Sequence, residues 1–151
     1  MIRVQRETFD IGREAAALTA GKPGIGALVT FTGLVRDDNL GRGVTALTLE
    51  HYPAMTERAL ARIEQEALSR WPLQASLVIH RFGRMLPGEP IVGVATAAAH
   101  RGDAFQAAEF LMDWLKTQAP FWKLETDGEA EQWVDARSSD EAAADRWRQP
   151  G

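Results

Sequence analysis

Residues 112–125 read Met-Asp-Trp-Leu-Lys-Thr-Gln-Ala-Pro-Phe-Trp-Lys-Leu-Glu, and this stretch decides how the chain folds around two of its lysines. Lys116 and Lys123 stand seven positions apart, a spacing that an unbroken helix would bring onto one face. Pro120 excludes that helix, because it has no backbone N–H and pushes Ala119 out of the α region. The sequence therefore predicts that Lys116 lies in the last turn of a helix and that Lys123 lies on an extended segment beyond it.

Aromatic side chains accompany the two lysines: Trp114, Phe121 and Trp122. Two ammonium groups delivered from different elements beside aromatic rings are suited to bind an anionic substrate. The alternative is that both lysines lay their stems on apolar surface and keep their charges in water. This segment alone leaves the two interpretations open.

Size and composition describe an ordinary globular chain. Its 151 residues suffice for one domain with its own core but not for two, so we expect a single domain over residues 1–151. Hydrophobic residues make up 45% and charged residues 25%, which argues against disorder. The net charge of -4 disfavours a nucleic-acid binder, because such proteins present a basic face to the phosphates.

The chain contains no cysteine. Disulfides, thiolate metal sites and a cysteine nucleophile are therefore excluded, and any sulfur that the protein handles must arrive on another molecule. The three histidines, at positions 51, 80 and 100, show no metal-ligand spacing, and a serine-nucleophile elbow is absent. We expect neither a metal nor a cofactor.

No apolar run approaches the ~20 residues that a membrane span needs. The first residues, Met-Ile-Arg-Val-Gln-Arg, do not form the apolar core of a signal peptide. The sequence thus favours a cytoplasmic protein that does not enter a membrane.

Strand and helix patterns alternate irregularly along the chain. Outward from residues 112–125, a helix capped by Asp103 is expected before the lysines and a hairpin around Asp127-Gly128 after them. Further strands are expected at residues 2–5, 27–33, 44–50, 75–82 and 91–99, with helices after Asp10, Pro53 and Ser138. The strands at 27–33 and 44–50 are expected to pair as a hairpin with a long connection. Such a mixture predicts an α+β fold with largely antiparallel sheet and an additional small hairpin region.

Further cations stand at the ends of expected elements, where functional residues tend to gather. Arg36 follows a strand, and His100 and Arg101 precede the helix after Asp103. The N–H groups at a helix N-terminus favour an anion, so this pair suits a phosphate. If these cations converge with Lys116 and Lys123, they form one basic site.

Several segments then show a specific, ordered pattern. Residues 31–36 read Phe-Thr-Gly-Leu-Val-Arg, residues 47–56 read Leu-Thr-Leu-Glu-His-Tyr-Pro-Ala-Met-Thr, and residues 99–101 read Ala-His-Arg. Together with residues 39–41, 79–83, 112–125 and 133–137, they resemble the large-subunit family of molybdopterin synthases over nearly the whole chain.

This resemblance implies an α/β-hammerhead-type fold and a large-subunit homodimer that carries a small ubiquitin-like subunit at each end, a heterotetramer overall. The small subunit's C-terminal Gly-Gly thiocarboxylate would enter a pocket and donate sulfur to cyclic pyranopterin monophosphate. Two such transfers would build the dithiolene of molybdopterin, the organic part of the molybdenum cofactor. The chain would then be a sulfurtransferase.

The resemblance also implies roles for individual residues. Lys116 and Lys123 are the expected catalytic residues. The substrate-contacting segments correspond to Leu34, Val35, Arg36, His100, Arg101, Lys116, Lys123, Leu124, Glu125 and, less directly, Arg137. Some of these residues would act across the dimer interface. Leu124 departs from the family, which often has a basic residue there, so only a backbone contact would survive at this position.

A different class of protein shares the basic site. A non-catalytic dimeric module that binds anionic small ligands or a partner's C-terminal tail would need the same cations but no proton transfer. The sequence leaves that alternative open.

Overall fold

The computed structural model describes residues 1–128, 130–134 and 138–148. The helices are α1 (Ile11–Thr19), α2 (Pro53–Arg70), α3 (Arg101–Gln118) and α4 (Ser138–Asp145). The strands are β1 (Ile2–Gln5), β2 (Ala27–Leu34), β3 (Asp38–Asn39), β4 (Arg42–Gly43), β5 (Ala46–His51), β6 (Leu73–Arg81), β7 (Gly83–Met85), β8 (Pro90–Ala98), β9 (Phe121–Asp127) and β10 (Ala130–Val134).

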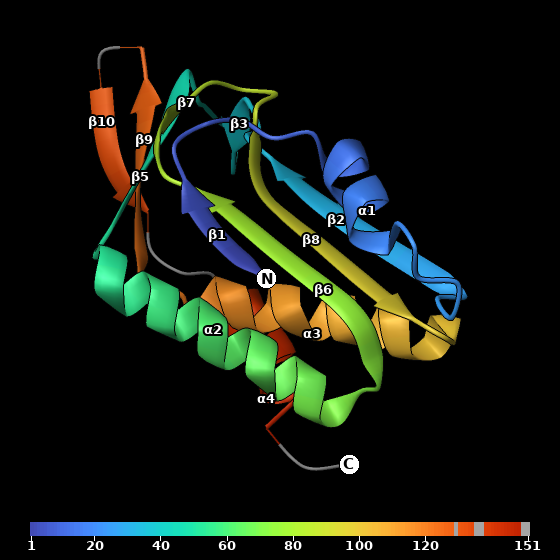
Figure 1. Cartoon of the computed structure of the whole chain (residues 1–151). Coiled ribbons are helices and arrows are strands. Elements are labelled where there is room, and N and C mark those ends of the chain that lie inside the picture. The colour runs from blue at the N-terminus through green and yellow to red at the C-terminus, as the bar shows by residue number, and fades with distance from the viewer. Residues whose placement is uncertain (129, 135–137, 149–151) are drawn as a thin grey trace.

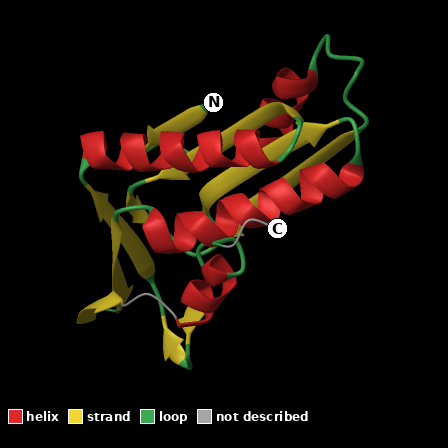
Figure 2. Cartoon of the chain, turned by 90° about the horizontal axis from the view of Figure 1, so that it is seen from below, coloured by secondary structure: helices red, strands yellow, loops and turns green. Residues whose placement is uncertain are grey.

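The main sheet has the strand order β1-β6-β8-β2. Only β1 and β6 pair in parallel, and the other two ladders are antiparallel. Helices α2 and α3 run along one face of this sheet, while α1 covers the other (Figures 1 and 2). The sheet is therefore buried on both faces, which explains why most residues in the middle of its two central strands, β6 and β8, are apolar.

Strand β6 shows how the two faces are filled. Leu77 and Ile79 point to the α1 side, where they pack with Phe9 and Leu18. Val78, one residue out of phase, points to the α2 and α3 side and joins the larger core there. On β8, Gly93 permits the close approach of Phe9, because a Cβ at this position would lie 2.6 Å from the Phe9 ring.

Helix α2 begins at Pro53, near the expected position, and ends at Arg70. Pro53 occupies the first turn, and the backbone leaves the helical conformation at Trp71. Ala59, Ile63 and Ala67 are buried along one stripe, as expected from their four-residue spacing. The stripe does not extend to Met55, which has the same four-residue spacing but is 56% exposed.

A second sheet, β10-β9-β5-β7, stands at one end of the main sheet (left in Figure 1). All its pairs are antiparallel, and the expected hairpin at Asp127-Gly128 forms between β9 and β10. The expected hairpin between residues 27–33 and 44–50 is wrong. Strand β2 pairs with β8 and β5 pairs with β9 and β7, because the intervening segment carries the chain from one sheet to the other.

That segment forms a small hairpin of its own, β3–β4, closed by Leu40 and Gly41. Both closing residues have positive φ values, 54° and 81°, as a two-residue turn of type I′ requires. The α+β class, the largely antiparallel pairing and the additional small sheet region are thus confirmed. None of the described helices is both long and apolar enough to cross a membrane.

Candidate anion-binding site

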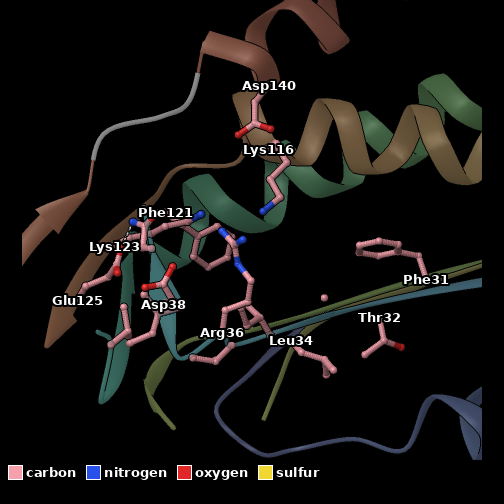
Figure 3. Close-up of a pocket in the computed structure, with 16 residues that line it drawn as sticks. Phe31, Thr32, Leu34, Arg36, Asp38, Lys116, Phe121, Lys123, Glu125 and Asp140 are labelled. Carbon is pink, nitrogen blue, oxygen red and sulfur yellow. Dashed lines mark hydrogen bonds between the residues drawn. The ribbon is translucent and has the colours of Figure 1, made fainter. Parts of the chain in front are cut away.

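A cavity of about 550 Å³ opens where the end of β2 and the end of α3 meet the second sheet (Figure 3). We call it the basic cavity. Its walls come from segments far apart in the sequence: Phe31, Thr32, Gly33, Leu34, Val35, Arg36, Asp38, Asn39, Val44, Leu47, Ile91, Lys116, Phe121, Lys123, Glu125 and Asp140.

Lys116 and Lys123 reach the basic cavity from the two elements that the sequence predicts. Helix α3 ends at Gln118, and Ala119 adopts an extended conformation with ψ of 127° before Pro120. Lys116 therefore lies in the last helical turn, where the helix dipole favours a cation. Lys123 lies on β9, beyond the proline.

Strand alternation divides β9 between two environments. Phe121, Lys123 and Glu125 line the basic cavity, whereas Trp122 and Leu124 do not. Trp122 instead packs edge-on against Tyr52, with ring centroids 4.7 Å apart. Of the three aromatic residues expected beside the lysines, only Phe121 lines the cavity, since Trp114 packs against Phe110 in the core.

The segment after β2 supplies the third cation, Arg36, together with the apolar wall residues Leu34 and Val35. Val35 is fixed through its backbone: its N–H donates to Glu89 at 2.9 Å and its carbonyl accepts from Gly88 at 2.8 Å. In Figure 3 the side chains of Arg36 and Lys116 extend toward one another from opposite walls.

Behind Phe121 lies a buried histidine, His80, whose ring stacks on Phe121 at a centroid distance of 3.8 Å. Burial lowers the pKa of His80 to about 4; a hydrogen bond between Nδ1 and the Arg81 carbonyl opposes this shift, and the charges of Lys116 and Lys123 add to it. Both lysines thus act on the same ring. This agrees with their convergence around Phe121.

Acidic side chains also line the basic cavity. Of these, only Glu125 was predicted from the sequence. Asp38 and Asp140 join it, the latter from α4 near Lys116 (Figure 3). Asp38 lies two residues after Arg36, so its place beside a strand end was a usable signal. Nothing local in the sequence marks Asp140, because its position depends on how α4 packs against α3.

His100 and Arg101 do not line the basic cavity of their own chain. They stand at the opposite end of α3, so that about 22 Å of helix separates Arg101 from Lys116. Both are exposed. Asp103 is not the helix cap as expected, because the helix already begins at Arg101 and His100 is the N-cap. Arg137 lies outside the described residues.

The basic cavity can bind an anion with three cations and can offer acceptors to a donor on the same ligand. Within the described part of the chain, no group of three His, Asp or Glu side chains could hold a metal ion. Fold and site together define an α+β protein with a mixed-charge cavity whose three cations suit a small anionic ligand.

Comparison with known proteins shows the family to which this α+β chain belongs. Residues 4–118 match the model of the MoaE protein family, and the chain belongs to this family. The molybdopterin synthase catalytic subunit of Pseudomonas aeruginosa is 56% identical over 98% of this chain and 99% of its own length.

Solved structures agree. The molybdopterin biosynthesis MoaE protein from Burkholderia ambifaria is 56% identical, with a TM-score of 0.83 over 97% of both chains. A molybdopterin synthase from Staphylococcus aureus is 28% identical, with a TM-score of 0.81 over 88% of this chain and 96% of that one.

Proposed function

We propose that this chain is the catalytic subunit of a molybdopterin synthase. As a sulfurtransferase acting as a single domain in the cytoplasm, it would convert cyclic pyranopterin monophosphate to molybdopterin. The observation that carries the proposal is the meeting of Lys116, Lys123 and Arg36 in one cavity. These residues come from three separate segments of the chain. Membership in the MoaE family and relatives that bear this name support it.

The sulfur would come from a partner, because the chain itself has no cysteine. The partner is a small ubiquitin-like subunit whose C-terminal Gly-Gly thiocarboxylate enters the basic cavity. Each transfer breaks the carbon–sulfur bond of the thiocarboxylate and forms a carbon–sulfur bond at a substrate carbon, whose bond to oxygen is broken in exchange. The tail leaves as a carboxylate after taking up an oxygen that water supplies.

The cavity residues have distinct roles in this reaction. The Lys116 ammonium stabilises the negative charge that develops on the tail's carbonyl oxygen. Lys123 binds the substrate or transfers protons to and from it. Arg36 binds the anionic part of the substrate. Leu34 and Val35 form the apolar wall.

The strand geometry of β9 accounts for the unusual Leu124. Its side chain does not line the basic cavity, so contact with the substrate would use its backbone. Replacement of the family's usual basic residue would then leave substrate binding intact.

His100 and Arg101 would complete the site from a second copy of the chain. About 22 Å of helix separates Arg101 from Lys116 in the same chain. Binding of the substrate phosphate by His100 and Arg101 would therefore require the homodimer. With one small subunit at each end, the assembly would be a heterotetramer.

The direct test is turnover. The purified chain, mixed with thiocarboxylated small subunit and cyclic pyranopterin monophosphate, is expected to yield molybdopterin, detected as its fluorescent oxidation product. A module that only binds anions or a partner's tail would bind both components and form no dithiolene. That result would replace the proposed activity with the non-catalytic alternative.

Replacing Lys123 by alanine is expected to lower kcat/KM about 50-fold, because the variant loses one charge-assisted contact to the substrate in a partly buried site. Steady-state kinetics with the reconstituted complex measure this effect. Lys22→Ala is the matched control, since Lys22 is an exposed lysine in the turn after α1, away from the cavity. Unchanged kcat and KM in Lys123→Ala would remove this residue from the site.

A further inference from the structure

The carboxylate of Glu125 is held in an unusual way within the basic cavity. The residue is only 5% exposed although its side chain is a carboxyl group. Its Oε1 accepts a hydrogen bond from Nδ2 of Asn39 at 2.5 Å. Its Oε2 is buried and has no hydrogen-bond partner among the residues that the structure describes.

Asn39 reaches Glu125 from the β3–β4 hairpin, which is 86 positions away in the sequence. The same hairpin holds Glu125 a second time, because the Arg42 guanidinium donates to the Glu125 backbone carbonyl at 3.3 Å. Asn39 and Arg42 are directly paired across the hairpin. The hairpin thus grips both the backbone and the side chain of one cavity residue.

The terminal torsion of a glutamate is soft, so a carboxylate turns freely unless one oxygen is fixed. We propose that Asn39 is a positioning residue that fixes Oε1 of Glu125 and so presents Oε2 to the substrate as a single, oriented acceptor. This inference rests on the proposed function, because it names how the same cavity selects its ligand.

The chemistry of the ligand group follows from that of Oε2. An ionised carboxylate oxygen only accepts hydrogen bonds, and a buried one without a partner costs free energy until a donor reaches it. The ligand must therefore bring an N–H or O–H group to this wall, while its anionic part lies toward Lys116 and Arg36. A pterin carries N–H donors on its ring and meets this requirement, whereas the cyclic phosphate diester of the same substrate offers only acceptor oxygens at neutral pH.

Asn39→Ala tests the proposal. The KM for cyclic pyranopterin monophosphate is expected to rise about tenfold with kcat within about twofold of wild type, since the lost orientation weakens binding in ground state and transition state alike. The control is Leu40→Asn, which changes the 92% exposed hairpin tip while suiting its positive φ and leaving the grip on Glu125 in place. Wild-type KM in Asn39→Ala would overturn the inference.

A double-mutant cycle shows whether Asn39 acts through Glu125. In a Glu125→Gln background, adding Asn39→Ala is expected to change KM by less than about twofold. Independent, multiplicative effects of the two substitutions would contradict a positioning role and indicate that Asn39 contacts the substrate by itself or only stabilises the hairpin.

The pH profile of Asn39→Asp gives a readout that hairpin stability does not imitate. Two facing carboxylates repel one another when both are ionised and share a proton as the pH falls. The KM of Asn39→Asp is therefore expected to exceed the KM of Asn39→Ala at high pH and to approach the wild-type value on acidification. Identical profiles for the two variants would refute the proposal. Failure of the wild-type complex to form molybdopterin would instead refute the proposed function.

Discussion

Replacing Lys116 by alanine is expected to lower kcat by roughly 10²–10³-fold, the usual loss when one donor to a developing oxyanion is removed. The substitution leaves Lys123 and Arg36 to hold the substrate, so KM should change little. This pattern identifies an interaction made mainly in the transition state. It differs from the expectation for Lys123, whose loss is expressed in kcat/KM.

Single-turnover measurements with thiocarboxylated small subunit would place the defect at the sulfur-transfer step. Stability is a suitable control, because Lys116 is exposed and its truncation should change the free energy of unfolding by no more than about 0.5 kcal/mol. Lys116→Arg keeps the charge but spreads it over a larger planar group, so partial recovery is expected. Full activity in Lys116→Ala would exclude the residue from the mechanism.

The segment that contains both lysines shows which parts of the fold are determined by neighbouring residues in the sequence. Pro120 ends α3 and starts β9 by its own backbone chemistry, so the positions of Lys116 and Lys123 on separate elements followed from sequence alone. The Asp127-Gly128 hairpin followed for the same reason. The pairing of β2 with β8 did not, because partners 56 to 71 positions apart are chosen by tertiary packing.

The candidate site divides in the same way. Its cations were found because lysine and arginine at element ends stand out in a sequence. Asn39 was not singled out, because an amide in a polar loop is ordinary until its partner is known, and Glu125 lies on another sheet. His100 and Arg101 show the reverse: their spacing at a helix start suited an anion, but one chain does not bring them to the cavity.

His80 links the cavity wall to stability through pH. Its ring lies nearly parallel to that of Phe121, with an interplanar angle of 14°. While the imidazole is neutral, it places no charge in the core. Burial is the largest cause of the fall of its pKa from 6.5 to about 4. Protonation in the folded state would place a third positive charge beside Lys116 and Lys123, in the region that we propose binds the anionic substrate.

The folded protein is therefore expected to lose stability as the pH falls from about 6.5 to about 4. In this window His80 is largely protonated in the unfolded chain but largely neutral in the folded chain. The free energy of unfolding therefore decreases on acidification. The full contribution is present above pH 6.5, and its total is about 3 kcal/mol for a shift of this size.

Chemical denaturation of the wild type and of His80→Gln across this range measures the contribution of His80 as the difference between two curves. Glutamine can still donate to the Arg81 carbonyl but does not titrate, so the variant should be less stable at pH 7 and less sensitive to acid. The gap between the two proteins should narrow as the pH approaches 4. Since the carboxylates and His51 titrate in both proteins, their effects cancel in the difference. Parallel curves would mean that His80 titrates alike in the folded and unfolded chains. The buried position behind Phe121 would then accept a protonated imidazole, contrary to the effect expected from burial.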